Sequence, residues 1–182
     1  MIEVRFHGRG GQGAVTSCEL MAQAAIAEGR YAQAFPSFGP ERRGAPLQAY
    51  LRISDDPIRL REKIYHPNVV VVLDPALLAS GAVKDGLKED GVLVANSSKT
   101  VAEVRGQCGY SGRTAVVDAA VIAQQELGVP ITNTTMLGAL LKAVELVELD
   151  SLKAPLDARF GRLAEKNLAA LQRAYAETEI EE

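Results

Sequence analysis

The sequence predicts an α/β fold: one domain on an open, mostly parallel, Rossmann-like sheet with helices on both faces. Apolar, valine-rich runs recur at residues 69–73, 91–96 and 114–118, as expected of strands buried on both faces of a parallel sheet. Patterns typical of helices alternate with these runs, and this alternation implies right-handed crossovers. A glycine-rich turn joins the first strand to the first helix, as in many sheets of this class.

Length and composition limit the class of protein. The 182 residues suffice for one domain with a core, but not for two comfortable ones. The net charge of −3 suggests neither a nucleic-acid binder nor a membrane-surface protein, and no apolar run approaches the length of a membrane span. Because the N-terminus enters a strand pattern directly, with no secretory signal, we expect a cytoplasmic protein.

The first strand and helix enclose a glycine loop. Residues 2–6 alternate apolar and polar side chains as a strand does, and residues 14–28 are nearly all good helix formers. Between them lies His-Gly-Arg-Gly-Gly-Gln-Gly, residues 7–13. Four glycines in six residues are unfavourable inside a helix or strand, so we expect a loop from Gly8 to Gly13. A helix N-terminus presents unpaired N–H groups and a positive dipole end, so the loop predicts an anion or cofactor site.

Other interpretations of the glycine loop stay open. Gly8, Gly10 and Gly13 satisfy the spacing of the dinucleotide fingerprint, which leaves a stand-alone NAD(P)-binding protein as an alternative. That fingerprint needs an acid at the tip of the second strand, which here covers residues 31–35 and meets no acid before Glu41. No Gly-Lys-Ser/Thr sequence occurs, which excludes the nucleoside-triphosphate loop. A tight turn without a ligand is less favoured, because such a turn needs neither the arginine nor the glutamine found here.

A second loop, residues 36–46, follows the second strand. Its three prolines and two glycines predict a fixed shape. We expect the first two strands to be neighbours, so that the two loops bring Arg9, Arg42 and Arg43 together, where guanidinium groups bind phosphate or carboxylate. Adjacent arginines on an extended loop point to opposite sides, so we expect one to bind the anion while the other pairs with Glu41 or with a partner chain. The alternative is that these charges form a solvated run.

Strands and helices alternate along the middle of the chain. The expected elements are strands at 47–53, 69–73, 91–96 and 114–118 (the last one), a turn at 54–57, and helices at 75–84 and 119–127. Ligands in such sheets collect beyond the carboxyl ends of the strands, where Asp74, Asn96 and Asp118 also lie. For Asp74 and Asn96 taken singly, we favour a cap or turn role.

The C-terminal part is predicted to be helical. A helix over residues 136–147, with Asn133 as the expected N-cap, is apolar on more than one face and should be buried. A second helix over 157–176 places apolar residues in one stripe: Phe160, Leu163, Ala164, Leu168, Leu171 and Tyr175. We expect the acidic residues 177–182 to fray.

The chain offers little catalytic chemistry. Cys18 and Cys108 lie in no metal or redox spacing, so we expect no iron–sulfur cluster, structural zinc or other metal site. No nucleophile–base pair or carboxylate dyad can be assembled from local spacing, so no catalytic residue is predicted. His7 is either a proton donor or ligand contact, or simply a hydrogen-bonded strand-end residue; His66 is expected to be structural or exposed.

Two motifs carry a family resemblance. The residues His-Gly-Arg-Gly-Gly-Gln-Gly at 7–13 and Phe-Gly-Pro-Glu-Arg-Arg-Gly-Ala-Pro at 38–46 resemble the gamma subunit of CoA-dependent 2-oxoacid:ferredoxin oxidoreductases, above all the pyruvate and branched-chain enzymes. Residues 52–58 also fit. The resemblance covers essentially the whole chain, which implies a single gamma domain over residues 1–182 with a C-terminal helical segment at about 151–177.

The resemblance implies a division of labour within a complex. The complex would use thiamine diphosphate with Mg²⁺, [4Fe-4S] clusters and CoA, held by alpha, beta and ferredoxin-like delta subunits, with no cofactor held by this chain alone. Pyruvate is the expected substrate; branched-chain and aromatic 2-oxoacids (phenylglyoxylate, indolepyruvate) and 2-oxoglutarate stay open, as does ferredoxin or NAD as electron acceptor. The residues expected to face CoA are Gly8, Arg9, Gly10, Gly11, Gln12, Gly13, Phe38, Gly39, Glu41, Arg42 and Arg43. Alternatively, the two loops only hold a subunit interface.

Overall fold

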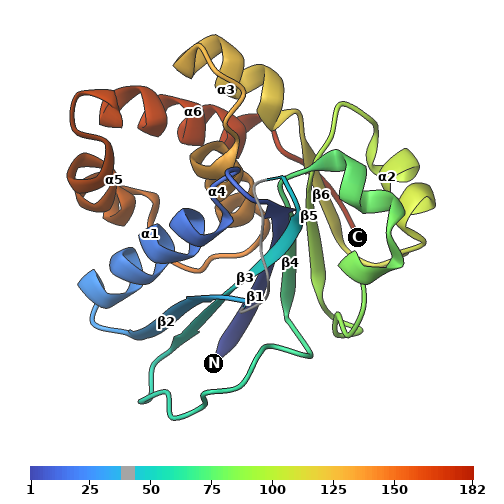
Figure 1. The fold of residues 1–182 in the computed structure, drawn as a ribbon, viewed down its shortest axis with the longest axis horizontal. Helices are drawn as coiled ribbons and strands as arrows, with labels where there is room; N and C mark the ends of the chain where they lie inside the picture. The colour runs from blue at the N-terminus through green and yellow to red at the C-terminus, as the bar shows by residue number, and fades with distance from the viewer. Residues whose placement is uncertain (38–43) are drawn as a thin grey trace.

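A computed structural model describes residues 1–37 and 44–182 of the chain. Its strands are β1 (Ile2–Arg9), β2 (Tyr31–Pro36), β3 (Pro46–Ser54), β4 (Val69–Val72), β5 (Val92–Asn96), β6 (Thr114–Val117) and β7 (Glu179–Glu181). They form one sheet in the order β2-β3-β1-β4-β5-β6-β7 (Figure 1). Strands β1, β4, β5 and β6 pair in parallel, whereas β3 and β7 run antiparallel to their neighbours. The predicted α/β class is confirmed.

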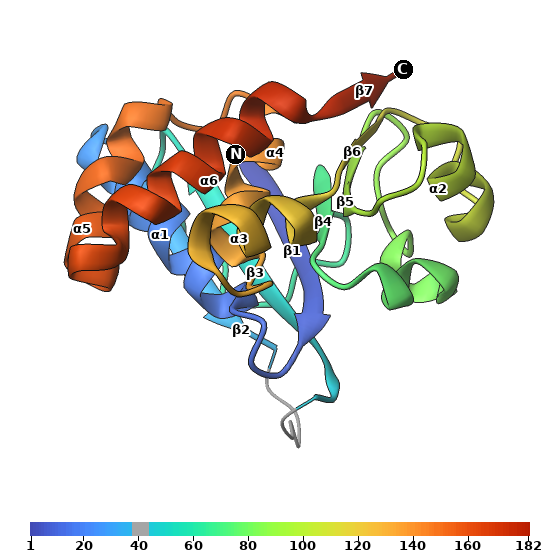
Figure 2. The ribbon, with the colours of Figure 1, turned by 90° about the horizontal axis from the view of Figure 1, so that it is seen from above.

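Helices cover both faces of this sheet. The α-helices are α1 (Ala14–Ala27), α2 (Val101–Cys108), α3 (Ala119–Leu127), α4 (Asn133–Ala143), α5 (Lys153–Phe160) and α6 (Ala164–Glu177). The 3₁₀ segments are η1 (Pro75–Ala79), η2 (Gly81–Val83), η3 (Leu149–Leu152) and η4 (Gly161–Leu163). Helix α2 lies on one face, and the other α-helices gather on the opposite face (Figure 2). In the described part of the chain, none of the helices is long and apolar enough to cross a membrane.

The alternation of side chains along the strands builds one core on each face. Val4, Phe6 and Val71 belong to the large core beneath α1, α4 and α6. Val70 and Val72 point the opposite way and belong to a smaller core beneath α2 and η1. A strand of four consecutive valines therefore serves both cores at once, as the continuous apolar run predicted.

The prediction that the first two strands are neighbours is wrong. Strand β3 lies between them and pairs along its whole length with β1, from Ile2 opposite Ile53 to Arg9 opposite Pro46. It also pairs with β2, so that β2 becomes an edge strand running in the direction of β1. The sheet is consequently mixed on this side. Because β1 and β2 run in the same direction, the loops that follow them nevertheless leave from the same end of the strands.

Strand β1 also extends further than predicted. His7, Gly8 and Arg9 are strand residues, and Gly8 pairs with Leu47 of β3. The entropy cost of a glycine within a strand is about 0.5–1 kcal/mol, which is small beside the hydrogen bonds that an eight-residue pairing supplies. The loop is therefore the short turn from Gly10 to Gly13 and not the whole of residues 8–13.

Several other boundaries differ from the predictions. The predicted helix 75–84 consists of the two short segments η1 and η2, the predicted helix 157–176 is split by η4 into α5 and α6, and helix α2 was not predicted. The C-terminal residues do not fray: β7 pairs with β6, and Arg105 donates hydrogen bonds to the carbonyls of Glu181 and Glu182 at 2.8 and 2.7 Å. Asn133 begins α4 as a helical residue and not as its N-cap.

Candidate functional site

The short turn after β1 lies against Gly44 and Ala45, the two residues immediately before β3. The N–H of Gly10 donates to the Ala45 carbonyl at 3.0 Å, and the N–H of Gly44 donates to the Gly10 carbonyl at 3.1 Å. The described end of the second loop thus contacts the glycine turn, as predicted. Phe38, Gly39, Glu41, Arg42 and Arg43, predicted to face the same ligand, lie outside the described residues.

Arg9 is not a free cation. Its Nε lies 2.8 Å from Oδ2 of Asp74, and its Nη1 donates to the Gly44 carbonyl at 3.2 Å. Gln12 donates to the same Asp74 oxygen at 3.1 Å and accepts from the Arg9 N–H at 2.7 Å. The other oxygen of Asp74 accepts from the Ala76 N–H at 2.9 Å, as an N-cap does. These hydrogen bonds fix the shape of the turn, so the predicted cap role of Asp74 is confirmed and extended.

Helix α1 begins at this turn without a cap. Its N-cap residue, Gly13, has a left-handed φ of 82°, makes no side-chain capping bond, and is followed by no acidic residue in the first turn. Nothing in the helix therefore neutralises its first N–H groups or the positive end of its dipole. An N-terminus of this kind is suited to an anion supplied from outside the helix.

Asn133 adds an amide to the same place, which the sequence analysis overlooked. A Cβ on Gly13 would lie 2.6 Å from Nδ2 of Asn133, so the amide is seated directly on the glycine. Asn133 is 6% exposed as a whole residue, and its side-chain amide forms no hydrogen bond with another described residue. The amide therefore has donors and an acceptor to offer to solvent or to a ligand at the start of α1. In the sequence, Asn133 is only an asparagine before an apolar helix, a pattern that indicates a helix N-cap and gives no sign of the contact with Gly13.

A cavity of about 480 Å³ opens beside this turn, at the edge where the parallel strands end. Its lining residues are Gly11, Gln12, Leu73, Pro75, Asn96, Ser97, Ser98, Asp118, Ala120, Val121, Pro130, Ile131 and Thr132. The loops after β1, β4, β5 and β6 all contribute, as expected of a ligand crevice in an α/β sheet. Asn96 donates to the Leu73 carbonyl at 2.9 Å and Asp118 caps α3 through the Val121 N–H at 3.1 Å, so both mainly shape the walls.

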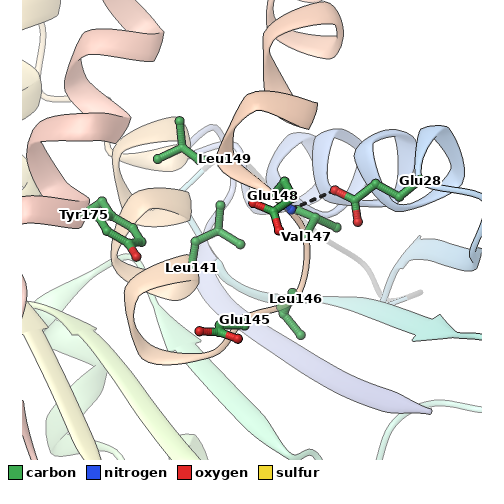
Figure 3. A pocket seen from close by; sticks show the side chains of 8 residues that line it. All are labelled: Glu28, Leu141, Glu145, Leu146, Val147, Glu148, Leu149 and Tyr175. Atoms are coloured by element: carbon green, nitrogen blue, oxygen red, sulfur yellow. Dashed lines mark hydrogen bonds between the residues drawn. The ribbon is translucent and has the colours of Figure 1, made fainter.

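A second cavity of about 420 Å³ lies between the end of α1, the end of α4 and α6. Figure 3 shows Glu28, Glu145 and Glu148 around it, with Tyr175 and leucines completing the wall. Glu28 accepts a hydrogen bond from the Glu148 N–H at 2.7 Å. Three carboxylates and no lining cation would repel a phosphate or an oxoacid. Of these two cavities, the one at the glycine turn is the better candidate for an anionic ligand, because it has a single lining carboxylate and adjoins the N-terminus of α1.

His7 is a buried acceptor and not a proton donor. It is 5% exposed, and its Nε2 accepts a hydrogen bond from Nε of Arg5 at 2.9 Å. Burial, and then the Arg5 guanidinium, lower the pKa of His7 from 6.5 to about 3. The imidazole is therefore neutral at physiological pH. Of the two interpretations of His7, the hydrogen-bonded strand-end residue is the correct one, and the other histidine, His66, is exposed as expected.

The pKa of His7 predicts a stability that rises with pH. The unfolded state binds a proton near pH 6.5 and the folded state only near pH 3, so the folded state loses stability as the pH falls below 6.5. Lowering the pH from 8 to 5 should therefore reduce the free energy of unfolding by about 2 kcal/mol through the protonation of this one residue. The difference between the free energies of unfolding measured in urea at pH 8 and pH 5 should be smaller in His7→Gln than in the unaltered chain. An equal pH dependence in the two proteins would contradict the assignment.

The described residues offer no metal site. No three His, Cys, Asp or Glu side chains gather as possible ligands anywhere in residues 1–37 and 44–182. Cys18 lies in the core on the α1 face of the sheet and Cys108 in the core on the α2 face, so the sheet separates the two thiols.

Comparison with known proteins covers the whole chain. A family model described as pyruvate ferredoxin/flavodoxin oxidoreductase matches residues 3–177. The chain is 51% identical over 182 residues to the pyruvate/ketoisovalerate oxidoreductases common subunit gamma of Pyrococcus abyssi, covering 99% of this chain and 98% of that one. It is 49% identical over 180 residues to the pyruvate synthase subunit PorC of Methanothermobacter thermautotrophicus, covering 98% and 97%. The crystal structure of pyruvate oxidoreductase subunit PORC from Thermotoga maritima matches with a TM-score of 0.90 and 41% identity, covering 100% and 98%.

These matches agree with the geometry of the turn and confirm the predicted resemblance. The alternative of a stand-alone NAD(P)-binding protein is set aside, because β2 is not adjacent to β1 and cannot place a ribose-binding acid beside the glycines. The relatives are subunits of oxidoreductases over nearly their full length, so the predicted role as one subunit of a 2-oxoacid oxidoreductase is confirmed. The chain belongs to the pyruvate ferredoxin/flavodoxin oxidoreductase family, as a gamma-type subunit.

Proposed function

We propose that this subunit presents a CoA-binding surface in an enzyme that converts pyruvate to acetyl-CoA and CO₂. The surface consists of the turn Gly10–Gly13, the N-terminus of α1, Asn133, and Arg42 with Arg43. The observation that carries the proposal is the uncapped start of α1, which lies against the side-chain amide of Asn133, an amide that forms no hydrogen bond with the described residues.

The chemistry of this surface suits the phosphates of CoA. The first N–H groups of α1 and the helix dipole favour negative charge. Arg42 and Arg43 follow β2 in sequence and precede Gly44, which is hydrogen-bonded to the turn, so the chain can deliver two guanidinium groups close to the same place. The adjoining cavity of about 480 Å³, with Leu73, Val121 and Ile131 in its wall, has room for the less polar part of such a ligand.

The redox and decarboxylation chemistry is assigned to partner subunits. The donor sets that [4Fe-4S] clusters and Mg²⁺-bound thiamine diphosphate require do not gather in the described part of this chain. We therefore propose alpha, beta and ferredoxin-like delta partners that hold these groups, within the cytoplasm. In that arrangement this chain binds and orients the acyl acceptor and excludes water from it, and contributes no catalytic residue.

The proposal is tested by replacing both arginines in the assembled enzyme. Because each charged hydrogen bond to phosphate adds affinity, Arg42→Ala/Arg43→Ala should raise the KM for CoA by about tenfold or more. The KM for pyruvate and kcat at saturating CoA should stay unchanged. The matched control is Arg162→Ala/Lys166→Ala, which removes two exposed cations that form no ion pair with described residues.

Two outcomes would contradict the proposal. An unchanged CoA dependence in a correctly assembled complex would exclude the arginines from CoA binding. A variant that no longer assembles with its partners, measured by mass photometry, would show that the loops hold a subunit interface only. The choice of pyruvate as substrate is tested separately, by measuring kcat/KM in the same complex for pyruvate and for branched-chain, aromatic and five-carbon dicarboxylic 2-oxoacids. The value for pyruvate should be the highest.

A further inference from the structure

Arg5 is a buried arginine on β1 whose charge has no counterion in the described part of the chain. It is 5% exposed and points toward the α2 face, since its neighbours Val4 and Phe6 belong to the opposite core. Its Nε donates to His7 at 2.9 Å, and its Nη2 donates to the carbonyls of Val83 and Asp85 at 3.3 and 2.6 Å. Nη1 has no acceptor among the described residues, so two N–H donors of the guanidinium are left over.

Arg52, the other buried arginine among the described residues, has the carboxylate partner that Arg5 lacks. Arg52 is 1% exposed, lies 2.8 Å from a carboxylate oxygen of Glu3, and is also bonded to Gln33 and to the Glu62 carbonyl. Arg5 lies two strand positions away on a neighbouring strand, in a similar environment, but forms no ion pair with a described carboxylate. Buried charges are normally paired because leaving water is costly. Burial accordingly lowers the pKa of Arg5, with Tyr50 and Asp85 only partly opposing the effect.

A cavity of about 550 Å³ gives access to Arg5 from solvent. Its lining residues are Arg5, Gln48, Tyr50, Lys63, Ile64, Tyr65, His66, Asp85 and Gly86. The Tyr50 hydroxyl donates to Gln48 at 2.7 Å, so its oxygen stays available as an acceptor. Among its arginine, lysine and acidic residues, the lining carries two positive charges, Arg5 and Lys63, and one negative charge, Asp85. One added negative charge would make the lining neutral.

We propose that this cavity binds a singly charged oxyanion, a carboxylate or a phosphate, through Nη1 of Arg5, with Lys63 contributing from the rim. Guanidinium donors are well suited to such oxygens. His7 holds the guanidinium in place by accepting from Nε and is a positioning residue. The site is separate from the glycine turn, because Arg5 and Gly10 are five residues apart on an extended strand, or about 17 Å.

The site is tested on the full-length chain with inorganic phosphate and acetate as probes, at constant ionic strength. The NMR signals of the arginine Nε–H groups report the titration, and Arg5→Gln identifies the Arg5 signal by its loss. We expect a saturable shift of that signal with a dissociation constant on the order of millimolar. Equilibrium dialysis with labelled phosphate should show at least tenfold weaker binding in Arg5→Gln, and several-fold weaker binding in Lys63→Met. Lys142→Met, which removes an exposed lysine beside Tyr175, is the control and should bind as the unaltered chain does.

The outcomes separate cleanly. Absence of a saturable shift, or phosphate binding that Lys63→Met leaves unchanged, would overturn the proposal, and the second criterion holds even if Arg5→Gln fails to fold. Dialysis of the assembled complex, with Arg5→Gln complex as the reference, then distinguishes the source of the oxyanion. Binding in both free chain and complex identifies a free anion. Binding in the free chain alone identifies an acidic side chain of a partner subunit as the group that occupies the same site.

Discussion

Replacing Gly138 by alanine is expected to destabilise the protein by about 3 kcal/mol or more. Gly138 lies in α4 where that helix packs on α6, and a Cβ there would collide with the backbone carbonyl of Leu171 and lie 2.9 Å from the backbone nitrogen of Tyr175. Backbone atoms cannot move aside as a flexible side chain can, so the two helices would have to separate. Alanine improves helix propensity by about 1 kcal/mol, which is too little to offset the overpacking.

Gly106 of α2 is the matched control for this prediction. It is also a glycine within a helix, but it is exposed, and a Cβ there would meet nothing within 4 Å. Gly106→Ala should therefore stabilise the protein by about 0.5–1 kcal/mol through propensity alone. Urea unfolding of the three proteins measures both effects. A Gly138→Ala variant as stable as the unaltered chain would show that α4 and α6 do not pack this closely.

Removing the carboxylate of Glu3 is expected to cost about 3–5 kcal/mol, because it leaves the buried Arg52 without its counterion. The pair joins β1 to β3 at 2.8 Å, and the arginine side chain is 1% exposed. Asp55→Ala is the control, because it removes a carboxylate that pairs with Arg30 and whose own side chain is 86% exposed. An exposed pair of this kind contributes about 0–1 kcal/mol.

A double substitution distinguishes the cost of an orphaned charge from the value of the pair. If the loss in Glu3→Ala comes from the unpaired guanidinium, Glu3→Leu/Arg52→Met should be much less destabilising than Glu3→Ala, since apolar replacements of buried pairs are often near neutral. The measurement is again urea unfolding at neutral pH. Equal losses in Glu3→Ala and Asp55→Ala would mean that Arg52 is solvated in solution.

The site was partly predictable from local sequence. The order strand, glycine turn, helix identifies the start of α1 as an anion site, because the chemistry of a helix N-terminus is set by residues next to one another in the chain. The partner of Arg9 was not predictable, since Asp74 is 65 residues away and nothing local selects it from among the other carboxylates. Asn133 was misinterpreted for the same reason: its neighbours indicate a cap, while its contact with Gly13 spans 120 residues of sequence.

The sequence by itself determined the fold class, the buried strands and the family, because side-chain periodicity, turn residues and long motifs are local properties. Tertiary structure was needed to show that β3 separates β1 from β2, that α6 packs closely on Gly138, and that Arg5 is buried with no counterion among residues 1–37 and 44–182. These features depend on which segments far apart in the chain pair with one another, and that choice is made by the sum of many weak long-range contacts. The glycine turn ends up beside Gly44 only because β3 pairs along the whole of β1.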